Sequence, residues 1–120
     1  MNKETVAVGI AYGTAKNNAP AETDHNEAMV AMLRENPEFA ELYLQIAFEE
    51  IYEPGGVSAF LVVLRQVIEA RGGIAAIAEK SGINRKHVYR VLSGKGNPTI
   101  RTLTELTRAA DVRLTAMHSA

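Results

Sequence analysis

The sequence predicts an all-α protein with a helix-turn-helix and a loose N-terminal tail. Apolar residues recur at helical spacing from His25 onward, and clusters of Pro and Gly divide that region into segments of helix length. One stretch, Ile74–Leu92, has the pattern of two short helices that cross at a glycine turn. At 120 residues, the chain has room for one compact domain with one core.

Residues 1–25 form the predicted tail, which is rich in Asn, Ala, Gly and Thr. Val6, Val8, Ile10 and Tyr12 alternate as in a short strand. The segment that follows offers this strand no obvious pairing partner, so we expect most of the tail to be loose.

Residues 26–56 form a predicted acidic helical region. The first helix begins with Asp24 or Asn26 as its N-cap, and the second covers Glu38–Tyr52 after Pro37. Apolar residues cover most of the circumference of this second helix, so it must be buried on more than one side. We expect a second subunit or a partner to cover one of those sides.

Residues 57–120 form the predicted helix-turn-helix domain. Its first helix begins at Ser58, a suitable N-cap, and ends before Gly72. Alternating apolar residues after the last helix suggest a short strand at Val112, Leu114 and Ala116. The helices expected between these points are Ile74–Ser81, Asn84–Leu92 and a last helix from Pro98 to about Ala110.

Charge divides the chain into two halves, although the net charge is only −1. Residues 1–56 carry three basic and ten acidic residues, whereas residues 57–120 carry ten basic and four acidic ones. This asymmetry suggests two different partners, with phosphate at the basic half and a basic protein at the acidic half. The alternative is the ordinary variation of charge between segments of a small protein.

The residues of Ile74–Leu92 suit two helices packed across a tight turn. Gly82 allows the positive φ that such a turn requires, and Asn84 can cap the second helix. Ala78 is small where the helices must cross closely, and Ile83 can fill the corner. With Val88, Val91 and Leu92 facing inward, the outward residues of the second helix are Arg85, Lys86, His87, Tyr89 and Arg90.

This outward face contains no acidic residue and suits the major groove of DNA. Arg85 and Lys86 lie in the first turn, where cations oppose the helix dipole, so stability alone would not favour them there. The alternative is a basic face that contacts only solvent. In the loop and helix start that follow, we expect Lys95 and Arg101 to contact phosphate, and Asn97-Pro98 to form an ordinary turn.

Two segments carry a resemblance to a known family. The run ARGGIAAIAEKSGINRKHVYRVLSGKGNPTIRTLTEL and the shorter NPEFAELYL at Asn36–Leu44 resemble the addiction-module antidote proteins. These HigA-like antitoxins belong to the Xre/Cro phage-repressor-like helix-turn-helix superfamily. The resemblance covers about Arg34–Leu114.

The resemblance implies a five-helix lambda-repressor-like domain with an N-terminal helical extension, usually a homodimer. It also implies double-stranded operator DNA and a small basic RelE/ParE-like toxin as partners, with repression of the protein's own operon. The implied scaffold residues are Ala78, Gly82, Val88 and Leu103. The implied base contacts are Arg85, Lys86, His87 and Arg90, and the expected phosphate contacts are Tyr89, Ser93, Lys95 and Arg101.

The chain departs from the pattern of the wider repressor family in two respects. Ile74 and Ala75 stand where repressors often carry a Gln-type donor, so we expect no side-chain phosphate contact there. Leu92 stands where many repressors carry an acidic residue, a difference from which we infer no change of function.

The acidic segment Glu22–Glu53 would complement a basic toxin. Phe39, Tyr43 and Phe48 are the candidate toxin or dimer contacts, although their helical spacing also fits the core. Two alternatives remain: a stand-alone Xre-like regulator without a toxin, and a protein-interaction module that has lost DNA binding. The basic second helix argues against the latter.

Other classes of protein are disfavoured. The chain has no Cys, which excludes disulfide scaffolds, thiol nucleophiles and Cys-based zinc sites. Three scattered His residues give no metal-ligand spacing, and no nucleotide-binding glycine motif occurs. Uncharged stretches of 11 residues at Thr5–Ala15 and Pro54–Leu64 are too short to span a bilayer. We therefore expect a cytoplasmic protein that is not an enzyme, with no metal, cofactor or membrane contact.

Overall fold

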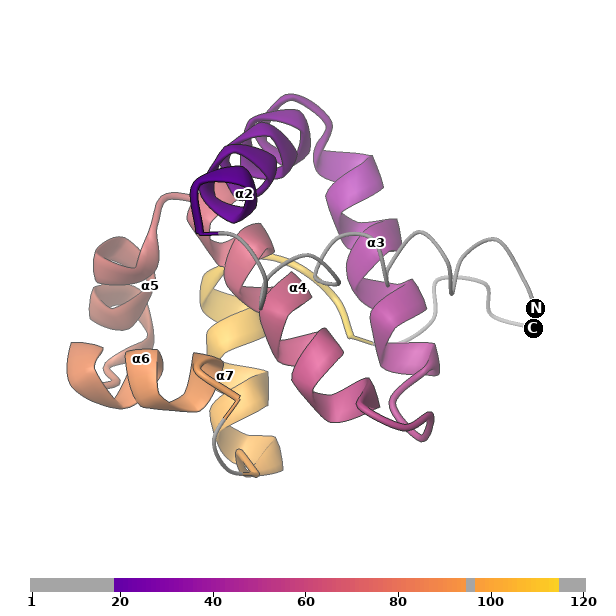
Figure 1. The fold of residues 1–120 in the computed structure, drawn as a ribbon. Coiled ribbons are helices and arrows are strands. Elements are labelled where there is room, and N and C mark those ends of the chain that lie inside the picture. The colour runs from indigo at the N-terminus through magenta and orange to yellow at the C-terminus, as the bar shows by residue number, and fades with distance from the viewer. Residues whose placement is uncertain (1–18, 95–96, 115–120) are drawn as a thin grey trace.

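The computed structural model describes residues 19–94 and 97–114, with side chains from residue 24 onward (Figure 1). This part of the chain contains helices joined by loops and no strand, which confirms the all-α prediction for these residues. The helices are α2 (Ala19–Glu35), α3 (Pro37–Glu49), α4 (Gly56–Ala70), α5 (Ile74–Ser81), α6 (Arg85–Leu92) and α7 (Ile100–Ala109).

Helix α4 is the centre of the fold. It packs against α2, α3, α5 and α6, and α7 packs against α5 (Figure 1). Ten of the 15 residues of α4 are buried, more than one face of a helix can supply, so other helices must cover it on several sides. This arrangement places α3 on one side of the molecule and α5 with α6 on the other.

A single apolar core extends through the described helices. Fully buried side chains from five helices belong to this core: Leu33 in α2, Leu44 in α3, Ile77 in α5, Val88 in α6 and Leu106 in α7. The acidic helices α2 and α3 therefore share their core with the basic part of the chain. Burial of this kind, at about 25 cal/mol per Å² of apolar surface, is the main force that holds the six helices together.

A buried chain of hydrogen bonds links α2, α3 and α4. The Tyr43 hydroxyl donates to Oε1 of Gln66 at 2.9 Å, and Nε2 of Gln66 donates to Oδ1 of Asn26 at 3.1 Å. Burial raises the pKa of Tyr43 well above its usual value, so its hydroxyl keeps the proton that it donates. Tyr43 is thus a core residue with a satisfied polar end.

Several predicted helix ends were wrong. Helix α2 begins at Ala19, within the predicted tail, so Asp24 and Asn26 lie inside the helix and do not cap it. Helix α4 begins at Gly56 with Gly55 as its N-cap at φ 75°, so Ser58 lies in its first turn. Helix α3 ends at Glu49 rather than Tyr52, and the backbone N–H of Glu50 bonds back to its last carbonyls.

Close packing explains the early start of α4. A Cβ at Gly56 would overlap the carbonyl oxygen of Glu50 and lie 2.6 Å from that of Ile51. Only glycine allows the chain to turn so tightly between α3 and α4.

The segment after α7 is not a strand. Val112 is buried against the core, and its N–H bonds to the carbonyl of Thr107. The guanidinium of Arg71 donates to the carbonyls of Ala110 and Asp111 and to that of Pro37, which fixes this segment beside α3. The strands considered at Val6–Tyr12 and at Ala116 lie outside the described residues.

Candidate nucleic-acid interface

The turn between α5 and α6 has the geometry that its residues predict. Gly82 adopts the left-handed conformation at φ 76°, and its N–H and that of Ile83 bond to the carbonyl of Ala78. The Asn84 side chain accepts a hydrogen bond of 2.8 Å from the backbone N–H of Lys86 and caps α6. The glycine turn, the cap and the bounds of α5 are all confirmed.

Helix α6 has one apolar and one basic face, and both agree with the prediction. Val88, Val91 and Leu92 are buried in the core. The opposite face exposes Arg85, Lys86, His87, Tyr89 and Arg90. Arg85, Lys86 and Arg90 form no ion pair with the described part of the chain. The face therefore presents uncompensated positive charge to solvent, as an element that reads DNA does.

Tyr89 is held at the edge of this face by α4. The guanidinium carbon of Arg65 lies 5.6 Å from the centre of the Tyr89 ring, within range of a cation–π interaction. Arg65 is itself positioned by Glu69 through a hydrogen bond of 3.1 Å. Tyr89 is thus less free than the other residues of the face, although the residue is still 44% exposed.

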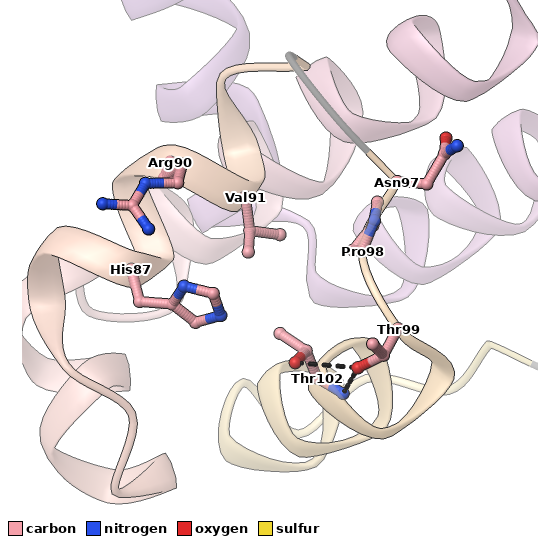
Figure 2. A pocket seen from close by; sticks show the side chains of 7 residues that line it. All are labelled: His87, Arg90, Val91, Asn97, Pro98, Thr99 and Thr102. Atoms are coloured by element: carbon pink, nitrogen blue, oxygen red, sulfur yellow. Dashed lines mark hydrogen bonds between the residues drawn. The ribbon is translucent and has the colours of Figure 1, made fainter.

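A hollow separates α6 from the start of α7. Figure 2 shows His87 pointing from α6 toward Thr99 and Thr102, with Val91 on the α6 side and Pro98 on the other. The Thr99 side chain caps α7 by accepting a hydrogen bond of 3.0 Å from the N–H of Thr102. Backbone N–H groups at a helix start favour anions. The hollow therefore combines a helix N-terminus with basic side chains from α6, which suits a phosphate of the DNA backbone.

The predicted phosphate contacts have different surroundings in the structure. Ser93 donates its hydroxyl proton to the carbonyl of Arg90 at 2.7 Å, so a phosphate contact would require this bond to break. Arg101 is exposed and lies 3.6 Å from Glu105, a surface pair of little energetic weight. Lys95 lies outside the described residues. Sequence reasoning missed Thr102, although the Thr99–Thr102 spacing is the one that capping side chains use.

The start of α5 offers no side-chain donor, as the departure from the repressor pattern predicts. Ile74 is buried, and Ala75 is exposed but has no polar group. Gly73 precedes the helix at φ 98°. Contacts from this end of α5 would have to use the backbone alone.

The three aromatic residues predicted as toxin or dimer contacts divide into two groups. Tyr43 is buried and bonded to Gln66, which makes it a core residue of the free chain. Phe39 and Phe48 are 39% and 37% exposed. Each also packs on an aromatic neighbour, Phe39 on Tyr43 and Phe48 on Phe60. The spacing of the three residues along α3 cannot distinguish these roles, because the partner of Tyr43 lies on α4.

Neither a membrane span nor a metal cluster is found in residues 19–94 and 97–114. No helix there combines the length and the apolar character that crossing a bilayer requires. Likewise, those residues include no group of three or more His, Asp or Glu placed to hold a metal ion.

Comparison with known proteins places the chain in a family. A family model described as "Probable addiction module antidote protein" matches residues 23–118. A protein of Haemophilus influenzae described as uncharacterized is 30% identical over 76 residues, which cover 63% of this chain and 77% of that protein. No solved structure matches the chain. The family match begins inside α2 and covers all of the later helices, and the chain belongs to the family of probable addiction module antidote proteins.

Proposed function

We propose that this protein is the antitoxin of a type II toxin–antitoxin module. In this proposal it binds its operator through a lambda-repressor-like helix-turn-helix, α5 and α6. It neutralises a small basic toxin of the RelE/ParE type and represses its own operon in the cytoplasm. Family membership supports the antitoxin role. The uncompensated basic face of α6 supports the DNA-binding role most directly.

The proposed reading of DNA follows from the order of residues along α6. Arg85 and Lys86 occupy the first turn, which enters the major groove in this class of motif. Arg85 can bind the O6 and N7 atoms of a guanine with two parallel hydrogen bonds. His87 and Arg90 lie along the same exposed side, within reach of neighbouring bases.

Contacts to phosphate would fix the register of α6 on the duplex. The N-terminus of α7 and the hollow beside His87 are suitable for one phosphate, and Tyr89 for another. A homodimer would place two copies of α6 one helical turn of DNA apart, about 34 Å, and would read a palindromic operator.

The acidic side of the molecule is the proposed toxin-binding side. The stretch Pro37–Gly56 contains five Glu residues and no Lys or Arg. A basic toxin would be steered toward this stretch by its charge. The structure places it away from α6, so toxin and DNA need not compete for one surface.

Two measurements test the proposal together. The full chain is titrated against DNA from upstream of its own gene and against unrelated DNA of equal length. It is also co-expressed with the product of the adjacent gene, which alone carries a tag. We expect preferential binding to the upstream DNA, a stoichiometric complex, and rescue of growth. DNA binding without a complex, beside a harmless neighbour, would instead indicate a stand-alone regulator.

A further inference from the structure

A groove lies at the C-terminal end of α3. Figure 1 shows that α3 lies on the side of the molecule away from α6. Its volume is about 300 Å³. The residues that line it are Gln45, Phe48, Glu49, Ile51, Tyr52 and Leu114. Most of this lining is apolar, although the groove opens on an acidic surface. The basic face of α6 has no part in it.

Gln45 is the unexpected member of this lining. Its side chain is only 6% exposed, yet its Nε2 atom has no hydrogen-bond partner within the described chain. Gln66, buried to a similar degree, has both ends of its amide bonded. An unpaired buried N–H destabilises the fold and is rare, so each case requires a reason. A partner that supplies a carbonyl oxygen to the groove would be such a reason.

Exposed aromatic side chains border the same groove. Tyr52 is 97% exposed and Phe48 is 37% exposed. An aromatic residue fully open to water stabilises nothing within the chain, whereas aromatic residues often carry most of the energy of a protein interface. The lining of the groove therefore combines the buried Gln45 with exposed aromatic side chains.

Charge identifies the kind of occupant. With five Glu and no Lys or Arg from Pro37 to Gly56, the surroundings of the groove attract a basic segment. A second copy in a twofold dimer would place this acidic surface against itself, which like-charge repulsion disfavours. Residues 115–120 contain no Lys or Arg and do not match the charge of the surface.

From these observations we infer that the groove is the docking site for a basic protein partner. One apolar side chain of the partner enters the groove beside Tyr52 and Phe48. The Gln45 amide, whose Nε2 is covered in the free chain, turns toward the groove and donates to a backbone carbonyl of the partner. Lys or Arg residues beside that side chain face Glu49. The inference rests on the proposed function only in requiring a protein partner, and it adds the surface and the chemistry of the contact.

The test uses the full chain and the purified product of the adjacent gene, with affinity measured by calorimetry. Gln45→Met removes the unpaired N–H and keeps the length of the side chain. We expect affinity to fall about tenfold or more, with no decrease in the unfolding temperature. Gln66→Met is the contrast, because it breaks two hydrogen bonds and should lower the unfolding temperature. Tyr52→Ala should also weaken binding about tenfold, and Ile100→Ala, a control at an exposed apolar side chain of α7, should not.

Each other outcome overturns the inference in a distinguishable way. If the complex forms and tolerates both Gln45→Met and Tyr52→Ala, the partner docks elsewhere and the antitoxin function stands. If no complex forms, both the inference and the toxin-binding part of the proposed function fail. If Gln45→Met lowers the unfolding temperature as Gln66→Met does, the amide is structural. Nuclear Overhauser contacts from the Gln45 amide to residues 1–18 or 115–120 in the free protein would show that the chain fills its own groove.

Discussion

Replacing Arg85 by Ala should weaken operator binding while stabilising the fold. Arg85 is the first residue of α6, is exposed, and forms no ion pair in the described part of the chain. Its removal therefore breaks no ion pair of the described chain. It also removes a cation from the positive end of a helix dipole, which should stabilise the fold by about 0.3–1 kcal/mol. Loss of a two-bond contact to guanine costs about 1–3 kcal/mol, or roughly 5- to 160-fold in affinity. The two effects have opposite signs, so a misfolded variant cannot imitate the result.

Fluorescence anisotropy with upstream and unrelated DNA, together with thermal unfolding, measures both effects. The matched control is Arg108→Ala, which removes an exposed Arg from the last turn of α7. There the charge favours the helix dipole, so the control should lose a few tenths of a kcal/mol in stability and keep its operator affinity. An equal loss of affinity for both DNAs would show that Arg85 contacts phosphate rather than a base. No loss for either DNA would refute the proposed docking of α6.

Three further predictions concern the supports of this helix and the core. Asn84→Ala removes the cap of α6 and should lower the free energy of unfolding by about 0.5–2 kcal/mol. Asn84→Ser keeps a capping side chain and should retain most of that stability. Gly82→Ala should lower the free energy of unfolding by about 1 kcal/mol or more, because φ at this turn is +76°. No atom obstructs a Cβ there, so the loss comes from the backbone alone. An unchanged midpoint of denaturant unfolding would contradict this prediction. Tyr43→Phe leaves Oε1 of Gln66 without its donor and should cost about 1–3 kcal/mol in the same measurement. Its control Phe39→Leu, at a more exposed ring, should cost less.

The sequence predicted well where one local rule determines the structure. Helix α5 ends at a glycine that adopts positive φ, and α6 begins at an Asn that caps it, so both helices could be placed from their own residues. The inward and outward faces of α6 followed from helical periodicity. The candidate DNA-binding residues were found because that periodicity left only basic and hydrogen-bonding side chains outside.

The predictions failed where contacts between distant segments determine a helix end or the burial of a side chain. Gly56 begins α4 because the preceding loop passes too close for any side chain, which overrides the capping preference of Ser58. Tyr43 lies in the core because Gln66, 23 positions away, accepts its hydrogen bond. The unpaired amide of Gln45 has no local signal, since a Gln on a polar stripe looks the same whether or not its N–H is satisfied.

Helix α4 connects the two proposed binding surfaces while keeping them apart. It packs on α3 beside the groove and on α6 beneath the basic face, whereas α3 touches neither α5 nor α6 within the described ranges. Its buried residues are packed on several sides, and close-packed interiors resist small shifts. A partner docked on α3 would therefore leave α6 in place and exposed, and the acidic surface that attracts a basic partner would be neutralised. Since that acidity otherwise opposes the approach of DNA phosphate, the proposed complex should bind operator at least as well as the free antitoxin.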